Sequence, residues 1–481
     1  MRRRAVLRAV GSGVAVTSAG ITSAHPTPTE SETRGTDATS TPATRDSDPL
    51  ATLEIEQTRE TVVSDDGTTA YVATVDGFVV ADIADPTAPT LVTEERVLAD
   101  HEDGPLTGIW DLHVDGDRLL VVGPANRGPS LRGFGYFDVT DPAAPEAIAA
   151  HETDFYIHNC VLDDGVAYLT GSGARGSPLV IIDPESGDEL ARWALRDHDE
   201  RWEDVPRTLI SLHDVWVQGD YASLAYWDGG TWILDISDPA VPTLVSRVRG
   251  RSIEELDAIE DPDRERLETP GNDHFVTVDE SGDLLGVGSE SWAADTDAEN
   301  GPGGIEFYDV SDPTEPTQLS RIEPPPTPDA TYGGAWTTAH NFELVGGRCY
   351  AAWYRGGVTV HDVSDPTNPV ELFRWRDDDR AKFWTAQRCS SGSAFVASSI
   401  GAYPKNEEDT DSEPPLSGLF TFPTPEVSTP TETTGGQTAN DDSSAMDSGQ
   451  TTDGTGDGGL SVGLLGLLGL GGLYRRYRRL E

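Results

Sequence analysis

The chain has 481 residues, of which 36% are hydrophobic and 25% charged, and 84 acidic against 34 basic residues give it a formal net charge of −50 at pH 7. This balance excludes a nucleic-acid-binding role, which needs a basic stripe, and three cysteines exclude a disulfide-bonded scaffold. The acidic residues are spread through every loop. Such a surface is typical of a protein that stays soluble where salt screens charge over about 3 Å.

The N-terminal residues 1–24 are predicted to be a targeting peptide. Residues 3–8 (RRAVLR) resemble the twin-arginine export motif, and a mildly apolar run rich in Gly, Ala and Ser follows them. A short basic helix is the alternative. Residues 25–49 are rich in Thr, Pro and Ser, so they bury too little apolar surface to fold and are predicted to form a disordered linker.

A repeated unit fills residues 50–423. Its most complete copy, residues 211–242, alternates short apolar runs with turn residues and predicts four strands. The third strand of a unit ends in Asp-Pro, and in most copies a second proline follows three residues later. The Asp lies at positions 85, 141, 183, 238, 312 and 365, the copy at 183 being degenerate. Asp bonds the backbone two residues on and Pro presets φ, so the motif suits a strand exit, whereas it would break a helix.

Four-stranded repeats of this length are the signature of β-propeller blades. After the sixth Asp-Pro mark, residues 384–389, 393–398 and 417–422 supply three more strands. The strand at 51–57 has no blade of its own. We therefore expect an all-β propeller with seven blades, closed by this N-terminal strand, because such closure removes an open sheet edge. The alternative is six blades, with residues 384–398 packed as an extension.

The strand ending D-[VI]-S-D-P-x-x-P, as at residues 309–316 and 362–369, resembles the LVIVD-repeat family of β-propellers. The resemblance covers roughly residues 50–422. It implies the fold, but the activity of that family is mostly unknown, so it implies little about chemistry.

The C-terminal part is predicted to attach the protein to a surface. Residues 424–459 are rich in Thr, Ser, Gly and Asp and are predicted to form a disordered stalk. Residues 460–481 join an apolar run, shorter than the roughly 20 residues of a spanning helix, to an arginine cluster that would stay on the cytoplasmic side. Together they resemble the sorting signals of archaeal surface proteins, without the usual Pro-Gly-Phe triplet. A retained membrane anchor, or a frayed tail, is the alternative.

The basic residues are almost all arginine, and only Lys382 and Lys405 are lysines. With the strong acidity, this composition resembles that of a haloarchaeal secreted protein. Export and cell-surface display, with membrane or lipid attachment through residues 460–481, are what these resemblances imply. Cys349 and Cys389 are predicted in neighbouring blades, where they could pair outside the cell; isolated buried thiols are the alternative.

Four of the ten histidines share one position in the repeat, at the start of the first strand and six to eight residues before its turn glycine. Two tryptophans hold the same position in other units. First strands are innermost in a propeller, so these side chains are expected to converge on one mouth of the central channel. They are His158, His213, His274, His340, Trp110 and Trp384.

Converging neutral imidazoles are a common way to hold Zn, Cu, Fe or Mn, with polar neighbours that orient them. Those neighbours would be Asn159, Asp214, Asp273 and Asn341. The arrangement is similar, in architecture alone, to metal-dependent propeller oxidases such as the selenium-binding, methanethiol-oxidising family. The alternative is that each imidazole bonds the backbone of a neighbouring blade and fixes the strand start. Thr61 is expected at the same repeat position, so histidine is not obligatory there.

The insertion at residues 253–271 reads as helical and either covers the channel mouth or forms a solvated surface helix. No HExxH or Walker motif occurs. Three functions remain open. The first is a binding module for a surface protein or small-molecule ligand; the second is a metal-dependent oxidoreductase or lyase that uses the four histidines; the third is a structural surface-layer component.

Overall fold

The structure, a computed structural model, describes residues 48–173, 176–296, 298, 301–389, 392–402 and 414–426. The predicted targeting peptide, nearly all of the linker and stalk, and the C-terminal segment lie outside the described residues. Among the residues described, no helix combines the length and apolar character that a membrane span requires.

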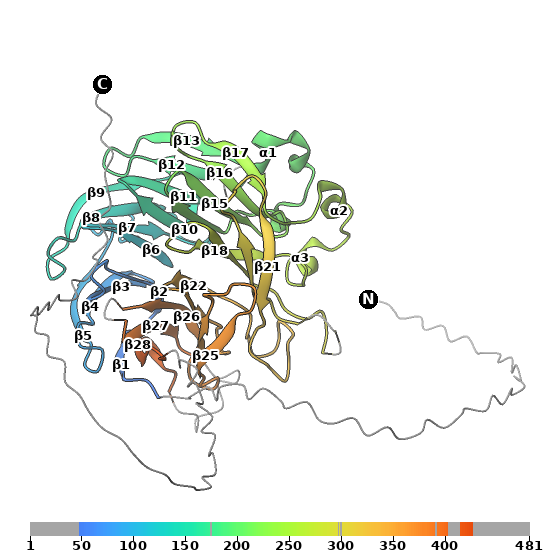
Figure 1. The fold of residues 1–481 in the computed structure, drawn as a ribbon. Coiled ribbons are helices and arrows are strands. Elements are labelled where there is room, and N and C mark those ends of the chain that lie inside the picture. The colour runs from blue at the N-terminus through green and yellow to red at the C-terminus, as the bar shows by residue number, and fades with distance from the viewer. Residues whose placement is uncertain are drawn as a thin grey trace, which may run out of the picture. The chain divides into compact units, whose positions relative to one another are not determined.

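The described strands form seven antiparallel sheets of four strands each, arranged in a ring as the blades of a β-propeller (Figure 1). The prediction of an all-β, seven-bladed propeller is confirmed. From the innermost strand outwards, blade 1 has β2 (Thr58–Val63), β3 (Thr69–Thr74), β4 (Gly77–Asp82) and β5 (Thr90–Glu95). Blade 2 has β6 (Asp111–Asp115), β7 (Arg118–Gly123), β8 (Gly133–Asp138) and β9 (Glu146–Glu152). Blade 3 has β10 (Tyr156–Asp163), β11 (Val166–Ser172), β12 (Leu179–Ile182) and β13 (Glu189–Trp193).

Blade 4 has β14 (Asp214–Gln218), β15 (Tyr221–Tyr226), β16 (Gly230–Asp235) and β17 (Thr243–Arg247). Blade 5 has β18 (Asp273–Val278), β19 (Leu284–Ser289), β20 (Ile305–Asp309) and β21 (Thr317–Ile322). Blade 6 has β22 (Phe342–Val345), β23 (Arg348–Ala352), β24 (Val358–Asp362) and β25 (Val370–Trp375). Blade 7 has β26 (Phe383–Arg388), β27 (Ala394–Ile400), β28 (Ser417–Pro423) and β1 (Ala51–Glu54).

The order of the blades is cyclic. Each first strand contacts the first strands of the two adjacent blades, and β2 of blade 1 contacts β26 of blade 7. In Figure 1 the fourth strands β5, β9, β13, β17, β21, β25 and β1 lie at the periphery. In blade 7 the peripheral strand β1 pairs with β28, with Thr52 opposite Phe420. The start and end of the described chain therefore share one sheet.

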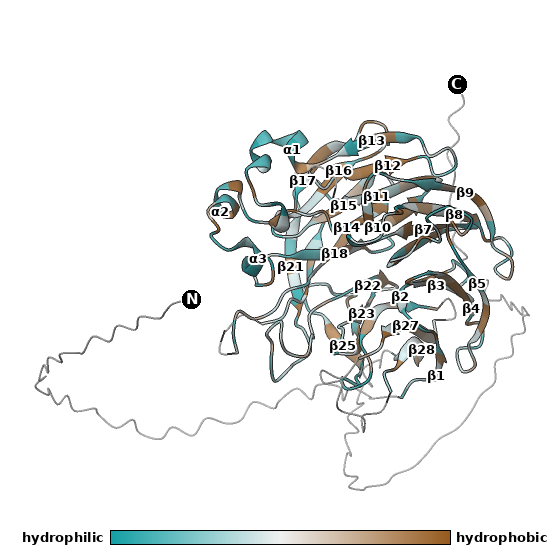
Figure 2. Cartoon of the chain, turned by 180° about the vertical axis from the view of Figure 1, so that it is seen from behind, coloured by the Kyte–Doolittle hydropathy of each residue, from teal (hydrophilic) through white to brown (hydrophobic). Residues whose placement is uncertain are grey.

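The core lies between the faces of adjacent blades. Middle strands such as β12 (LVII) are buried along their whole length, whereas the fourth strands are largely exposed. Middle strands are covered on both faces, so they read as continuous apolar runs, in the way that any strand buried on both faces does. Figure 2 shows this as brown along β12 and teal over the peripheral helices α1 (Leu195–His198) and α3 (Pro262–Glu265).

The Asp-Pro motif forms the turn that its chemistry predicts. Asp85 Oδ1 accepts the N–H of Thr87 at 2.9 Å, and Asp312 Oδ1 accepts the N–H of Thr314 at 3.0 Å. The turn also ties blades together, because the carbonyl of the motif proline accepts a hydroxyl from the preceding blade. Ser246 Oγ donates to Pro313 O at 2.6 Å. The repeated motif thus contributes to blade spacing as well as to strand exit.

The first strands face the channel with an edge that their own blade does not pair. Backbone N–H groups on that edge need acceptors, and polar side chains of the preceding first strand supply them. Asp111 Oδ2 accepts the N–H of Cys160 at 2.6 Å, and Asp214 Oδ2 accepts the N–H of Val276 at 2.9 Å. The polar residues of the innermost strands therefore link neighbouring blades along the channel by hydrogen bonds.

The insertion between blades 4 and 5 forms two short helices, α2 (Ile253–Asp257) and α3, instead of one. Asp261 caps α3 just before its first-turn proline, Pro262, and this new start separates the two helices. Before blade 4, the 3-10 turns η1 (Glu200–Glu203) and η2 (Arg207–Leu209) follow α1. The three cysteines are buried and free, so the Cys349–Cys389 pair considered from the sequence does not form in this structure.

Stability should depend on pH through the carboxyl groups in the channel layer. Burial raises the pKa of Glu60, Asp111 and Asp214 to about 8 each, and repulsion between the carboxylates adds to the shift. Their pKa in the unfolded chain is about 4. The folded state therefore holds more protons between about pH 4 and about pH 8, and this contribution to stability is lost as pH rises through that window.

We predict that the melting temperature falls from about pH 5 to about pH 9 and that Asp214→Asn reduces the fall. Asparagine keeps a carbonyl for the Val276 N–H but carries no charge. Calorimetry at constant high salt measures both slopes. Asp85→Asn, in an exposed turn, is the control and should keep the wild-type slope; an unchanged slope in Asp214→Asn would refute the assignment.

Candidate functional site

Each blade brings one side chain to the same end of the channel, and the rings of six of them form a closed circle. Proceeding around it, ring centroids are 4.2 Å apart for His158–His213, 3.8 Å for His213–His274 and 4.9 Å for His274–His340. The spacing continues with 4.3 Å for His340–Trp384, 5.5 Å for Trp384–Trp110 and 5.5 Å for Trp110–His158. The structure thus brings the four predicted histidines and two predicted tryptophans together.

Blade 1 contributes Arg59, which the sequence did not single out. Its guanidinium carbon lies 5.5 Å from the ring centre of Trp110 and 5.6 Å from that of Trp384. Thr61, expected at this position, is fully buried, because β2 shifts register between Thr58 and Thr61. We call the seven side chains the mouth ring: Arg59, Trp110, His158, His213, His274, His340 and Trp384.

The mouth ring lines a cavity of about 410 Å³, which we call the central cavity. Trp227 and Glu290 join its wall from the ends of second strands, and Lys382 joins from the residue before β26. In an antiparallel blade the first strand begins where the second strand ends, so both supply side chains to the same mouth. A neighbouring cavity of about 500 Å³ shares Arg59, Trp336 and Lys382 with the central cavity.

Three imidazoles of the mouth ring are fixed by backbone carbonyl groups. His158 Nδ1 bonds Ala125 O at 3.1 Å, His213 Nδ1 bonds His274 O at 2.8 Å, and His340 Nδ1 bonds Trp384 O. A carbonyl only accepts, so each Nδ1 carries the proton and each Nε2 keeps its lone pair. These bonds match the blade-fixing interpretation, and the same arrangement orients metal-binding imidazoles in proteins. The two interpretations are therefore compatible.

His274 differs from the other three histidines. Its Nδ1 is buried and has no hydrogen-bond partner among the described residues, and its Nε2 lies 3.5 Å from Glu290 Oε2. The other oxygen of Glu290 accepts the hydroxyl of Tyr354. Burial raises the pKa of Glu290 to about 7, while the Tyr354 hydrogen bond and the charge of Lys382 oppose that rise. Burial also lowers the pKa of Lys382 to about 8.

The four polar residues expected beside the imidazoles bond elsewhere among the described residues. Asn159 Nδ2 donates to Asp214 Oδ1 at 3.0 Å, and Asn341 Nδ2 donates to Glu60. Asp273 of blade 5 forms an ion pair at 2.5 Å with Arg249, which follows the last strand of blade 4. These side chains hold the blades below the mouth ring.

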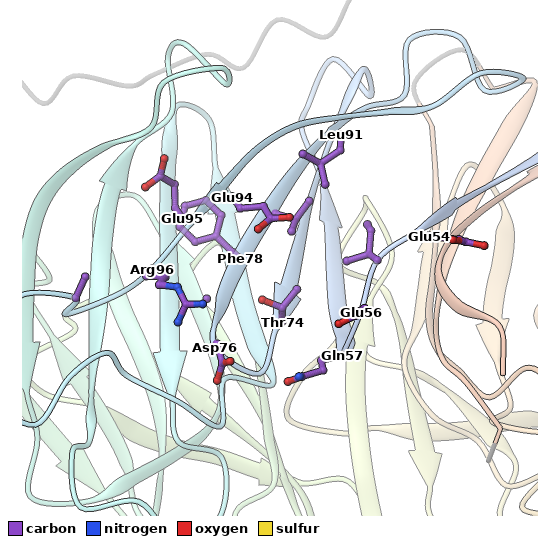
Figure 3. Close-up of a pocket in the computed structure, with 14 residues that line it drawn as sticks. Glu54, Glu56, Gln57, Thr74, Asp76, Phe78, Leu91, Glu94, Glu95 and Arg96 are labelled. Carbon is purple, nitrogen blue, oxygen red and sulfur yellow. The ribbon is translucent and has the colours of Figure 1, made fainter. Parts of the chain in front are cut away.

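A further groove of about 610 Å³ lies outside the channel, against β1 of blade 7 and blade 1 (Figure 3). Its charged lining consists of one arginine, Arg96, and five carboxylates: Glu54, Glu56, Asp76, Glu94 and Glu95. It has neither the histidines nor the tryptophans of the channel, so the central cavity is the better candidate site.

Comparison with known proteins supports the repeat and the fold. The LVIVD repeat profile matches residues 62–94, 211–249 and 338–377, so the chain contains LVIVD repeats, as predicted. It matches no curated protein sequence.

Among solved structures, this chain is similar to the β-propeller domain of Myceliophteria thermophila Cps50 (Swd1). The identity is 10% and the TM-score is 0.51, over 78% of this chain and 99% of that one. The structure of U3-55K is matched at 9% identity and a TM-score of 0.49, over 76% and 95% of the two chains. The first of these likenesses shows the fold alone.

The histidines of the mouth ring should remain uncharged in metal-free protein at mildly acidic pH. Burial lowers the pKa of His158 to about 4, and burial with the neighbouring imidazoles lowers that of His213 well below its usual value. We expect both rings to stay as the neutral Nδ1–H form at about pH 6, where a free imidazole is largely protonated. Nitrogen-15 NMR of histidine-labelled protein reads the tautomer directly. The urea-unfolded chain is the control, and imidazolium shifts for either ring at this pH would contradict the assignment.

Proposed function

We propose that this chain is an exported binding module, displayed at the cell surface, which holds a small anionic organic ligand in the central cavity. The observation that carries the proposal is the mouth ring. All seven blades deliver a side chain to one end of the channel, and these side chains line a cavity of about 410 Å³. Ligand sites are concave and combine aromatic side chains with convergent polar groups, as this cavity does.

The charges indicate the chemistry of the ligand. Arg59 and Lys382 line both cavities, and Arg355 joins them in the neighbouring one. The charged lining of that neighbouring cavity is cationic throughout, although acidic residues outnumber basic ones 84 to 34 in the chain. The central cavity also contains Asp111 and Glu290, so the cationic side is the one it shares with the neighbouring cavity, and an anionic group of the ligand is favoured there.

The aromatic residues indicate the shape of the ligand. Trp110 and Trp384 stand in the mouth ring, and Trp336 extends the wall toward the neighbouring cavity. The Lys382 ammonium lies 4.1 Å from the ring centre of Trp336, so charge and flat apolar surface are adjacent. Flat rings of this kind pack against aromatic or sugar rings. A carboxylate attached to such a ring satisfies both features.

We predict that an aromatic or sugar acid binds and that its neutral counterpart does not. Tryptophan fluorescence in high salt would be followed during titration with benzoate, glucuronate, benzyl alcohol and glucose. Arg59→Gln and Lys382→Gln should each weaken binding of the acid about 10-fold or more, because a hydrogen bond to a charged group contributes roughly 1.5–3 kcal/mol.

Arg96→Gln, in the groove of Figure 3, is the matched control and should bind the acid like the wild type. Failure of both acids to change the fluorescence would refute an anionic ligand of this class. Equal weakening by Arg96→Gln and Arg59→Gln would place the ligand outside the central cavity.

The export part of the proposal is supported by residues 3–8, by the Thr/Ser/Gly-rich residues 424–459 and by the strong acidity. We predict that replacing Arg3 and Arg4 together by lysine retains the protein in the cytoplasm of a host with twin-arginine export, because the export machinery reads the arginine pair. Immunoblots of cell and medium fractions measure this. Arg8→Lys is the control, and unchanged export of the double variant would contradict the prediction.

A further inference from the structure

We propose that His274, Glu290 and His340 bind one divalent transition-metal ion, with open coordination positions toward the central cavity. One ligand atom from each residue lies within 4.8 Å of the others. His274 is 3% exposed and His340 is 2% exposed, while the Glu290 side chain is 18% exposed. Two buried imidazoles and a carboxylate thus converge at the border of the cavity.

His340 is prepared to coordinate through one nitrogen. Its Nδ1 donates to the carbonyl of Trp384, which leaves Nε2 without a proton. A metal-binding histidine in proteins almost always donates its other ring N–H to a carbonyl or carboxylate, which fixes the ring and raises ligand basicity. The first strand of blade 7 supplies that carbonyl.

The contact between His274 and Glu290 is better suited to sharing an ion than to a hydrogen bond. Their Nε2 and Oε2 atoms are 3.5 Å apart, whereas N–H···O bonds run at about 2.7–3.2 Å. Two ligands each about 2.0–2.1 Å from a tetrahedral ion lie about 3.4 Å from one another. The observed separation matches the second value.

His274 would coordinate through Nε2, and unlike His340 its Nδ1 has no carbonyl partner among the described residues. If its proton is on Nδ1, that buried donor has no partner among the described residues, and the Nε2 lone pair faces a carboxylate oxygen. If the proton is on Nε2, the buried Nδ1 lone pair lacks a donor. In the Nδ1–H form, the Nε2 lone pair and the Glu290 oxygen repel one another, and a cation between Nε2 and Oε2 removes this repulsion. The hydroxyl of Tyr354 already holds the other oxygen of Glu290 in place.

The donor set indicates the class of ion. Two imidazoles and one carboxylate are the ligands of catalytic zinc sites and of non-haem Fe(II) sites, and these sites keep positions open for water or substrate. Ca²⁺ and Mg²⁺ take oxygen ligands and would not use the imidazoles. The ion is therefore Zn²⁺ or a similar first-row ion such as Fe²⁺ or Co²⁺.

This assignment uses two of the four histidines in the mouth ring. His158 packs between Trp110 and His213, and His213 donates to the backbone of His274. They shape the cavity wall. The inference deepens the proposed function, on which its ligand chemistry rests, because an open position on the ion beside Arg59 and Lys382 would take the carboxylate of the proposed ligand.

The test uses tag-free full chain, purified in high salt, stripped with a chelator and titrated with Zn²⁺ against a chromophoric chelator. We expect one tight equivalent, and with Co²⁺ the visible absorption bands of a four- or five-coordinate ion. Glu290→Gln and His340→Ala should each weaken Zn²⁺ binding by at least about 100-fold, and Tyr354→Phe by about 10–100-fold, as loss of an outer hydrogen bond typically does. Glu290→Gln is nearly isosteric, so it keeps the test valid if a histidine variant fails to fold.

His101→Gln, outside the mouth ring, controls for metal held by surface groups and should bind like the wild type. Absence of a tight equivalent in the wild type, or unchanged affinity in Glu290→Gln, overturns the site. Equal losses in His158→Gln and His274→Ala overturn the three-residue assignment in favour of a wider histidine set.

Titration of stripped protein with benzoate and glucuronate separates this inference from the proposed function. Acid binding without metal binding overturns the metal site alone. Metal binding without acid binding, in stripped and loaded protein alike, leaves the metal site standing and overturns the anionic ligand.

Discussion

The unpaired edge of each innermost strand is the constraint on which the channel of this propeller depends. The second strand pairs only one side of the first, so the remaining N–H groups must find acceptors across the boundary between blades. Asp111, Asp214 and Glu343 supply carboxylate oxygens, and Gln387 supplies an amide oxygen to Val63 across the boundary between blades 7 and 1. A propeller with purely apolar first strands would leave these groups unsatisfied. The polar character of the channel is thus first a requirement of the fold.

At the mouth ring, the polar side chains of the channel also form a candidate binding site. In His158, His213 and His340 the Nδ1 atom bonds a backbone carbonyl, and the Nε2 atom keeps its lone pair. Nδ1 fixes the ring to the backbone and Nε2 remains available to a ligand, so the same imidazole can have a structural role and a binding role. The pattern breaks at His274, where Nδ1 has no partner among the described residues and a carboxylate faces Nε2. That break is the place where an ion fits.

Much of the fold could be predicted from the sequence because its signals are local. The Asp-Pro turn needs only an Asp and the N–H two residues on, and it marks six of the seven blades. The histidines could be aligned because they share a repeat position.

The position of Arg59 could not be predicted from the sequence. A register shift in β2, which no local pattern marks, moves Arg59 into the position expected for Thr61. Glu290 and Tyr354 follow second strands, and only the antiparallel pairing of the folded blades brings them to the mouth. Lys382 was conspicuous in the sequence as one of only two lysines, but the repeat alignment did not indicate where in the propeller it lies.

The most direct test of the account is an anomalous X-ray difference map from crystals of the protein loaded with one equivalent of Zn²⁺, with data recorded on both sides of the zinc absorption edge. The account predicts one peak at the border of the central cavity, bounded by His274, Glu290 and His340, with His158 and His213 directed at the cavity but not at the ion. Peaks confined to surface carboxylates, with an ordered mouth ring and no ion, would contradict it and leave the histidines as residues that only fix the blades.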